Sequence, residues 1–443
     1  MDSGLSAILI KFREVIDDKY ADIIFRHFYF IKKNVYKNKK FLMIIGEFLK
    51  IIRELFGNLI TKSNYTQRTK TIHIVNFFNR DLRDENYLKI ILNKYFLKND
   101  FNICRHSFNY KYFDRGLFDN FAKRIDLIVK FTIFYFSKII NKNSFNFLIN
   151  NIFYISISYL VLTRYCLLGL TIIKNINENT KNLDNINLLF DSGIDPLLVG
   201  VLTYYTFIKS DAKNKNKINL ILYSYQHGMF VDEFHLSISN KQFLWPSSKK
   251  ILKESPFNLY NDLKKSSFYI SPQYKKYSKD YSYESQPVQI YIISQTHTDT
   301  FGFALSTFFQ ELTDNLITIN KNRNLLLLHP QELNVFRLIV DKNKNNILYP
   351  PHDLLKSSNK KNRSIVVGIC STALIECAKL GHFVIGFEIE PQESISAYKL
   401  YKPIVSFDSV NKVNNYIKNL LISNKKRAHH IHLQNEWINK IFN

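Results

Sequence analysis

Three short polar motifs follow apolar segments of this chain, and their residue types suit phosphate binding and proton transfer. The first is Tyr225-Gln226-His227-Gly228, the second is His329-Pro330, and the third is Cys370-Ser371-Thr372. The apolar segments before them, residues 218–222, 325–328 and 365–369, are typical of buried strands. In open α/β sheets, ligands bind beyond the carboxyl ends of the strands. We therefore expect the three motifs at the edges of such sheets.

The third motif predicts an anion site. Ser371 and Thr372 would begin a helix whose N–H groups bind anions, and their hydroxyls would add donors. An ordinary helix cap uses the same groups, so both interpretations can hold together. Glu376 lies about one helical turn after Thr372, and Gly381 stands where a glycine would end the helix. With Gly368 before them, these residues form the most specific spacing in the chain.

His329 and Gln295 are further candidates for contact with phosphate. An imidazole at a strand end can donate to a phosphate and, when protonated, offset charge on a leaving group. A His-Pro dipeptide by itself is more typical of a turn, and only its place between the other motifs favours the functional interpretation of His329-Pro330. Gln295 follows the predicted strand 288–294 and could reach a leaving phosphate, although an ordinary polar loop explains it equally.

A general base is the least certain assignment. His227 could take a proton or only position a substrate, with Gln226 and Gly228 holding an acceptor beside it. Asp191 follows the preceding predicted strand and offers a carboxylate; Asp195 and Asp232 are alternatives. Aspartates in turns are more often local caps than bases.

The elements that must position these residues predict an α/β fold. From about residue 185, strands and helices alternate, which indicates Rossmann-like βαβ units. We expect an amino-terminal domain over residues 1–265, helical in 1–180 and Rossmann-like in 185–265. A linker-like stretch, 264–287, would lead to a second Rossmann-like domain over 288–425, and a helix over 426–443 would cross back. Residues 145–174 form an apolar segment interrupted by Arg164, which favours a buried or interfacial helix over a spanning one.

Composition limits the function classes. The chain has 443 residues, a formal net charge of +24 and four cysteines. Such charge suits phosphorylated ligands, an anionic membrane surface or nucleic acid, but no nucleic-acid-binding signature accompanies it. The cysteines show no metal-ligand spacing and fit a reducing cytoplasm. Charged residues within the first 20 positions predict no signal peptide.

Together the motifs resemble those of the bacterial capsule and lipopolysaccharide glycosyltransferases of GT-B fold, in which two Rossmann-like domains face a cleft. That group includes the polysialyltransferases, the Kdo transferases and, more distantly, the glycerophosphate polymerases of teichoic acid. The resemblance covers about residues 185–390 and rests on Gln226-His227-Gly228, His329-Pro330 and Ser371-Thr372. It implies that His329 and Ser371 bind donor phosphate, that His329 acts as acid and that Glu376 holds the ribose.

The resemblance also implies a base in an acidic motif that ends in glycine. Asp191-Ser192-Gly193 is loosely similar to that motif and departs from it at the middle residue. The resulting hypothesis is a metal-independent glycosyltransferase without a cofactor, because no Asp-x-Asp motif stands at a credible strand end. It would use a nucleotide sugar, with a CMP-activated acid sugar (sialic acid, another nonulosonate or Kdo) preferred, and a surface polysaccharide, lipopolysaccharide or lipid-linked acceptor. We expect a cytoplasmic protein, peripheral on the inner face of the cell membrane.

Three alternatives remain open: a transferase that uses UDP- or GDP-sugars, a nucleotide-sugar epimerase of the same fold, and a non-catalytic basic protein that binds membranes or nucleic acid.

Overall fold

The chain carries two separate α/β sheets, one in each of two compact units. The computed structural model describes residues 40–64, 71–77, 85–112, 117–143, 145–179, 185–191, 196–210, 219–226, 239–249, 267–271, 287–293, 312, 314–319, 325–327, 347–348, 363–388 and 400–443. Unit 1 comprises Met1–His227, Phe234–Leu244 and Phe257–Phe268, and unit 2 comprises the rest of the chain. The predicted α/β class with two parallel sheets is confirmed, and the predicted domain bounds stay predictions.

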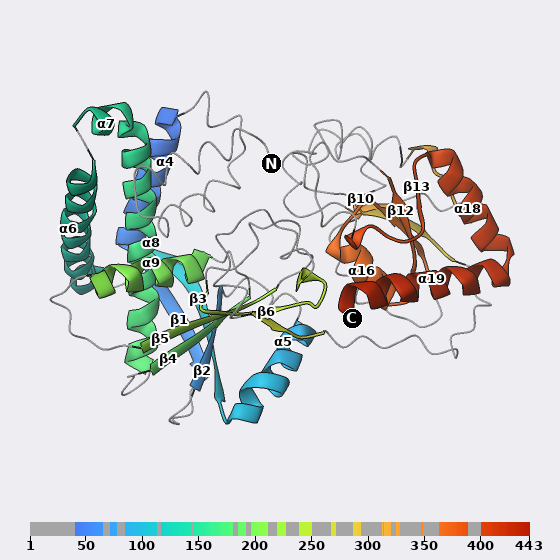
Figure 1. The fold of residues 1–443 in the computed structure, drawn as a ribbon, viewed down its shortest axis with the longest axis horizontal. Coiled ribbons are helices and arrows are strands. Elements are labelled where there is room, and N and C mark those ends of the chain that lie inside the picture. The colour runs from blue at the N-terminus through green and yellow to red at the C-terminus, as the bar shows by residue number, and fades with distance from the viewer. Residues whose placement is uncertain are drawn as a thin grey trace. The chain divides into compact units, whose positions relative to one another are not determined.

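Sheet A belongs to unit 1 and is mostly parallel (Figure 1). In spatial order its strands are β1 (Gly57–Asn64), β3 (Asn102–Tyr112), β2 (Thr71–Phe77), β4 (Asn185–Phe190), β5 (Asn219–Tyr225), β6 (Lys241–Leu244) and β7 (Ser267–Tyr269). Strand β1 pairs antiparallel with β3, whereas β3, β2, β4, β5 and β6 pair in parallel. The order of these five parallel strands is that of doubly wound sheets of the flavodoxin type.

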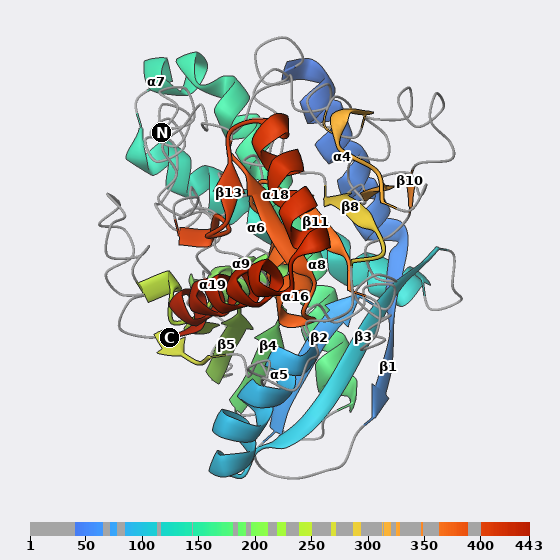
Figure 2. The same cartoon turned by 90° about the vertical axis from the view of Figure 1, so that its right-hand side faces the viewer.

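Both faces of sheet A are covered, which explains why its central strands read as apolar runs. On one face, Leu220 and Leu222 belong to a buried core that includes residues of α8 (Ile152–Asn179) and α9 (Pro196–Ser210). On the other face, Tyr225 of β5 contacts Tyr87 of α5 (Glu85–Ile91) edge to face, with ring centroids 6.3 Å apart. Helix α5 accordingly lies on the opposite side of the sheet from α8 and α9 (Figure 2).

Helix α8 is the core helix of unit 1. Its apolar stretch, Ile152–Asn177, is the one candidate membrane span in the described part of the chain, but 78% of the tested window is buried inside the protein. Arg164, the charge that interrupts it, pairs with Glu47 of α4 (Lys40–Phe56) at 3.2 Å, with side chains 10% and 3% exposed. The prediction of a buried helix is confirmed.

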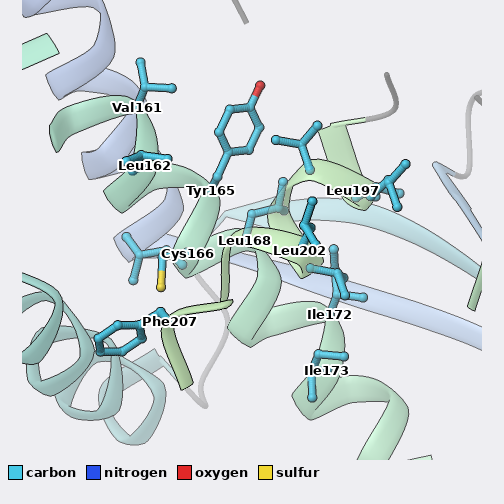
Figure 3. Close-up of a cluster of buried hydrophobic side chains, with 14 of the residues drawn as sticks. Val161, Leu162, Tyr165, Cys166, Leu168, Ile172, Ile173, Leu197, Leu202 and Phe207 are labelled. Carbon is cyan, nitrogen blue, oxygen red and sulfur yellow. The ribbon is translucent and has the colours of Figure 1, made fainter. Parts of the chain in front are cut away.

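Two glycines let α8 and α9 approach closely. A Cβ added to Gly169 would lie 2.2 Å from the carbonyl oxygen of Gly200, which no native Cβ tolerates. Around this crossing the side chains of the two helices interleave, for example Leu168 from α8 and Leu202 from α9 (Figure 3). The contact fixes where α9 leads into β5.

Sheet B belongs to unit 2 and is parallel throughout. In spatial order its strands are β10 (Ile347–Leu348), β9 (Leu325–Leu327), β8 (Ile290–Ile293), β11 (Ile365–Gly368), β12 (Phe383–Phe387) and β13 (Ser406–Phe407). Numbered along the chain, this order is 3-2-1-4-5-6, the Rossmann order. The described helices of unit 2 longer than one turn are α16 (Thr372–Lys379), α18 (Val410–Ile422) and α19 (Asn424–Phe442).

Gln434 fixes α19 onto sheet B. Its side-chain oxygen accepts from the backbone N–H of Val384 at 2.9 Å, and its side-chain nitrogen donates to the carbonyl oxygens of Ala378 and His382 at 3.2 and 2.9 Å. The predicted terminal helix is confirmed, and its described packing partners are α16, α18 and β12. That it crosses back to the first domain stays a prediction.

Two sequence-based predictions were wrong. Residues 57–60, expected to be helical, begin β1, and residues 102–112, within the region expected to be helical, form β3. The helical description of residues 1–180 is therefore too broad, because β1, β2 and β3 belong to sheet A. The stretch 264–287, expected to be a linker, contains β7.

Candidate functional site

Each sheet has one point where the strand order reverses, and α/β sheets bind ligands beyond the strand ends at such points. In sheet A this point lies between β2 and β4, and in sheet B it lies between β8 and β11. Asp191 directly follows β4, and Ser371 and Thr372 follow β11. Both groups of predicted residues therefore stand at a switch point.

Asp191 is a buried carboxylate at the carboxyl edge of sheet A. It is 3% exposed, and its Oδ1 has no hydrogen-bond partner among the described residues. Because Val75 pairs with Phe190, the next residues, Asn76 and Asp191, stand side by side at the ends of β2 and β4. A buried acceptor without a partner costs free energy, so this oxygen is available to a bound hydroxyl.

Gln226 stands beyond the neighbouring strand β5. Its backbone N–H donates to the carbonyl oxygen of Phe243 at 2.7 Å, and the residue is 6% exposed. Phe190 pairs with Ser224, so Asp191 lies one residue and Gln226 two residues beyond that pair at the same edge. His227 and Gly228 lie outside the described residues, as do the alternative bases Asp195 and Asp232.

Ser371 begins α16 as its N-cap. Its Oγ accepts from the backbone N–H of Ala373 at 3.2 Å, and its extended backbone (φ −148°, ψ 145°) is that of a capping residue. Thr372 is the first helical residue. The amino end of a helix carries partial positive charge and attracts anions. The expected cap is confirmed, and this end of α16 directly follows β11.

Gly368 and Gly381 explain why α16 lies close to the strand that precedes it. A Cβ on Gly368 would approach the side chain of Leu374 to 3.0 Å, so the glycine admits Leu374 against β11. Gly381 has φ 86°, the left-handed conformation of a glycine that ends a helix. Its N–H donates to Ala378, and the N–H of His382 donates to Cys377.

Glu376 is one helical turn into α16, and its carboxylate lies 3.5 Å from Nζ of Lys379. Its side chain is 35% exposed, so the pair is weak and solvated and leaves the carboxylate able to accept from a ligand hydroxyl.

Cys370 is a neutral group beside the site, whereas His382 is a neutral group at the opposite, amino-terminal edge of sheet B. Burial raises the pKa of the Cys370 thiol to about 12, which excludes it as a thiolate nucleophile at neutral pH. Burial, with a smaller contribution from Arg363, lowers the pKa of His382 to about 4. The Nδ1 of His382 accepts from the backbone N–H of Ser364 at 3.1 Å, so this imidazole has a structural partner.

His329, Pro330 and Gln295 lie outside the described residues. One residue that sequence reasoning missed is Asn76, whose Oδ1 accepts from Ser107 Oγ at 3.1 Å. Asn76 lies one residue before the end of β2, and only the pairing of β2 with β4 brings it beside Asp191.

Comparisons with known proteins give weak structural resemblances only. No family model and no curated protein matches the sequence. The S. aureus MnaA–UDP structure is 11% identical over 85% of this chain and 93% of its own, with a TM-score of 0.42. Sucrose-phosphate synthase from Thermosynechococcus elongatus is 10% identical over 85% and 95%, also with a TM-score of 0.42.

The wall teichoic acid polymerase TagF is 9% identical over 96% of this chain and 94% of its own, with a TM-score of 0.38. At this level of similarity, the roles of residues in those proteins do not carry over to this chain.

Proposed function

We propose that this chain is a glycosyltransferase that uses a nucleotide-sugar donor. The observation that supports it best is that the residues predicted to bind the donor and the acceptor both stand at switch points. Ser371 and Thr372 follow β11 at the switch point of sheet B, and Asp191 follows β4 at the switch point of sheet A.

The donor half of the proposal lies in unit 2. The amino end of α16 and the hydroxyls of Ser371 and Thr372 would hold the donor phosphate, and Glu376 would accept from the ribose hydroxyls. Negative charge grows on the leaving phosphate as the bond to the sugar breaks, and fixed donors stabilise such developing charge. His329 would add a further donor, as its resemblance to the polysialyltransferase motif implies.

The acceptor half lies in unit 1. Asp191 would take the proton from the attacking hydroxyl, because it offers a buried, unpartnered carboxylate oxygen at the ligand-binding edge of its sheet. Gln226, one strand away, would position the acceptor, and His227 is the alternative base.

For the donor we propose a CMP-activated acid sugar, on the resemblance of His329-Pro330 and Ser371-Thr372 to the polysialyltransferase and Kdo-transferase motifs. A thermal-shift series with CMP, CDP, UDP and GDP tests this choice, because a ligand that binds the folded chain raises its melting temperature. CMP should give the largest shift. A larger shift with UDP or GDP would exclude the CMP preference and leave the transferase proposal standing.

A matched pair of serine variants separates donor binding from helix capping. Ser371 caps α16 and Ser409 caps α18, both through the side-chain oxygen, and both lie in unit 2. Each Ser→Ala change should cost about 1 kcal/mol of stability. Only Ser371→Ala should also weaken nucleotide binding, by roughly tenfold for one lost hydrogen bond to a charged phosphate. Equal nucleotide affinity in the two variants would contradict a donor site at α16.

Asp191→Asn tests the base. The variant keeps the shape of the side chain and loses its proton acceptor, so transfer from a radiolabelled CMP-sugar to a membrane extract should fall by about 100-fold or more, with nucleotide binding unchanged. Full activity of Asp191→Asn would move the base elsewhere. Conversion of the free nucleotide sugar without acceptor would identify an epimerase, and salt-sensitive polyanion binding without nucleotide binding would favour the non-catalytic alternative.

We also propose peripheral contact with the inner face of the cell membrane. Helix α6 (Leu117–Lys142) exposes an apolar stripe of residues spaced one or two turns apart: Ile125, Val129, Ile133 and Ile140, which are 38–65% exposed. Lys123, Lys130 and Lys138 are also exposed on this helix. A helix with an apolar stripe beside lysines is typical of interfacial binding to anionic lipids. Ile133→Asp should release the chain from anionic vesicles, whereas unchanged binding would exclude this stripe.

A further inference from the structure

Three side chains of types that commonly ligate metals lie together on an otherwise apolar face of sheet A. They are His73 on β2 and Cys104 and His106 on β3, and they are 0%, 2% and 0% exposed. His73 pairs directly with Cys104, and side chains two residues apart on a strand share a face. Two residues further along the same strands, Val75 and Phe108 belong to the hydrophobic core. Packing alone therefore does not account for the polar trio.

The ligand atoms of the three residues converge. They all lie within 4.8 Å of one another, with 2.8 Å between His73 Nδ1 and His106 Nε2 and 3.3 Å between Cys104 Sγ and His106 Nε2. In a neutral imidazole each nitrogen is either a donor or an acceptor. His106 Nε2 can therefore form one good hydrogen bond, yet two polar atoms, His73 Nδ1 and Cys104 Sγ, lie close to it.

His73 Nε2 and His106 Nδ1 are buried and have no hydrogen-bond partner among the described residues. In either arrangement of the shared proton, one imidazole keeps a buried N–H without an acceptor and the other a lone pair without a donor. Each such group costs about 1–3 kcal/mol. Zinc on the two inner nitrogens would leave both outer nitrogens as N–H donors, so the convergence of the inner atoms favours a metal and these outer groups do not.

We propose that His73, Cys104 and His106 bind one zinc ion. Two imidazoles and a thiolate are ligands that zinc prefers, at about 2.0–2.1 Å for nitrogen and 2.3 Å for sulfur. Tetrahedral angles at those bond lengths separate two nitrogens by about 3.3 Å and a nitrogen from sulfur by about 3.6 Å. Binding therefore requires the two nitrogens to separate by about 0.5 Å more, and Cys104 Sγ and His106 Nε2 by about 0.3 Å more, than the distances seen here.

The site is separate from the proposed chemistry. His73 pairs with Leu188, three residues before Asp191 on β4, so the ion would lie about 10 Å from that carboxylate along the strands. Its ligands join β2 to β3, so bound zinc would stabilise the pairing of these strands. The proposal does not depend on glycosyl transfer.

Metal analysis of the full-length chain, purified without an affinity tag, tests the site. We expect about one zinc per chain, and lower content in Cys104→Ser and His106→Gln. Cys166→Ser is the matched control, because Cys166 is also a buried thiol of unit 1 but lies in α8. It should lose stability and keep its zinc.

Two spectroscopic and thermal measurements keep the test decisive if a variant misfolds. Wild-type protein stripped with a chelator and loaded with Co²⁺ should show a thiolate-to-cobalt charge-transfer band, and Zn²⁺ should raise its melting temperature. A chain without zinc, without the cobalt band and without a thermal response would overturn the proposal. Copper or iron in place of zinc would overturn the choice of ion, and zinc retained in Cys104→Ser would overturn the ligand set.

Discussion

Replacing Gly169 with alanine should destabilise unit 1, although alanine is the better helix former. The added Cβ would lie 2.2 Å from the carbonyl oxygen of Gly200, 2.7 Å from its carbonyl carbon and 2.6 Å from Cβ of Tyr204. None of these atoms is the end of a flexible side chain. Ordinary contact begins at 3.4 Å, so α8 and α9 would have to separate by about 1.2 Å at the crossing, the difference between 3.4 and 2.2 Å.

The magnitude follows from two opposing terms. Glycine to alanine inside a helix gains about 1 kcal/mol from helix propensity. Overpacking a core costs about 1–3 kcal/mol, and a collision with backbone belongs at the upper end. We therefore expect Gly169→Ala to lower the free energy of unfolding by about 2 kcal/mol.

Gly46→Ala is the matched control. Gly46 lies inside α4, also in unit 1, and a Cβ there meets nothing within 4 Å. It receives the propensity gain without the collision, so it should stabilise the chain by up to about 1 kcal/mol. Urea denaturation measures both variants, and the midpoints should move in opposite directions at unchanged m values. Equal shifts for the two variants would refute the close contact between α8 and α9.

Three further changes have expected outcomes measurable by denaturation. Gly381→Ala should cost about 1–2 kcal/mol because of the left-handed backbone at φ 86°, and Gly381→Asn should cost less; equal costs would contradict that conformation. Arg164→Met should cost about 2 kcal/mol, because buried Glu47 would lose one of its two cationic partners and keep Lys50 at 2.6 Å, and adding Glu47→Gln should recover part of the loss; no recovery would mean that Arg164 and Glu47 are not coupled. Burial lowers the pKa of His430 from 6.5 to about 4. As the pH falls, this imidazole therefore becomes protonated in the unfolded state before it does in the folded state. Stability present above pH 6.5 should fall by up to about 1.4 kcal/mol per pH unit as pH drops toward 4, and His430→Gln should reduce that slope.

Local patterns predicted most strands of both sheets, because a parallel strand buried on two faces is a short apolar run. Residues 325–328 and 365–369, for example, correspond to β9 and β11. β3 was not predicted as a strand, and the reason is physical. Its buried positions at Cys104, His106 and Phe108 include a histidine, which a hydrophobic pattern does not count as core.

The candidate site was predictable where its chemistry is local. Ser371 as a cap and Gly381 as a helix end depend on neighbours a few residues away, and both are as expected. The companions of Asp191 were not predictable, because Asn76 reaches it only through strand pairing across more than a hundred residues. The convergence of His73 with Cys104 and His106 depends on such pairing as well.

The strand order of sheet A also governs when unit 1 can fold during synthesis. β3 lies between β1 and β2 in space but follows both in sequence, and the other neighbour of β2 is β4, which begins at Asn185. As the chain leaves the ribosome, β2 emerges with apolar residues such as Ile72 and Ile74 and has no partner until Asn102–Tyr112 follows. Unpaired apolar strands in nascent chains aggregate and attract chaperones. Production of this protein should therefore depend on holding β2 apart until translation has passed β4.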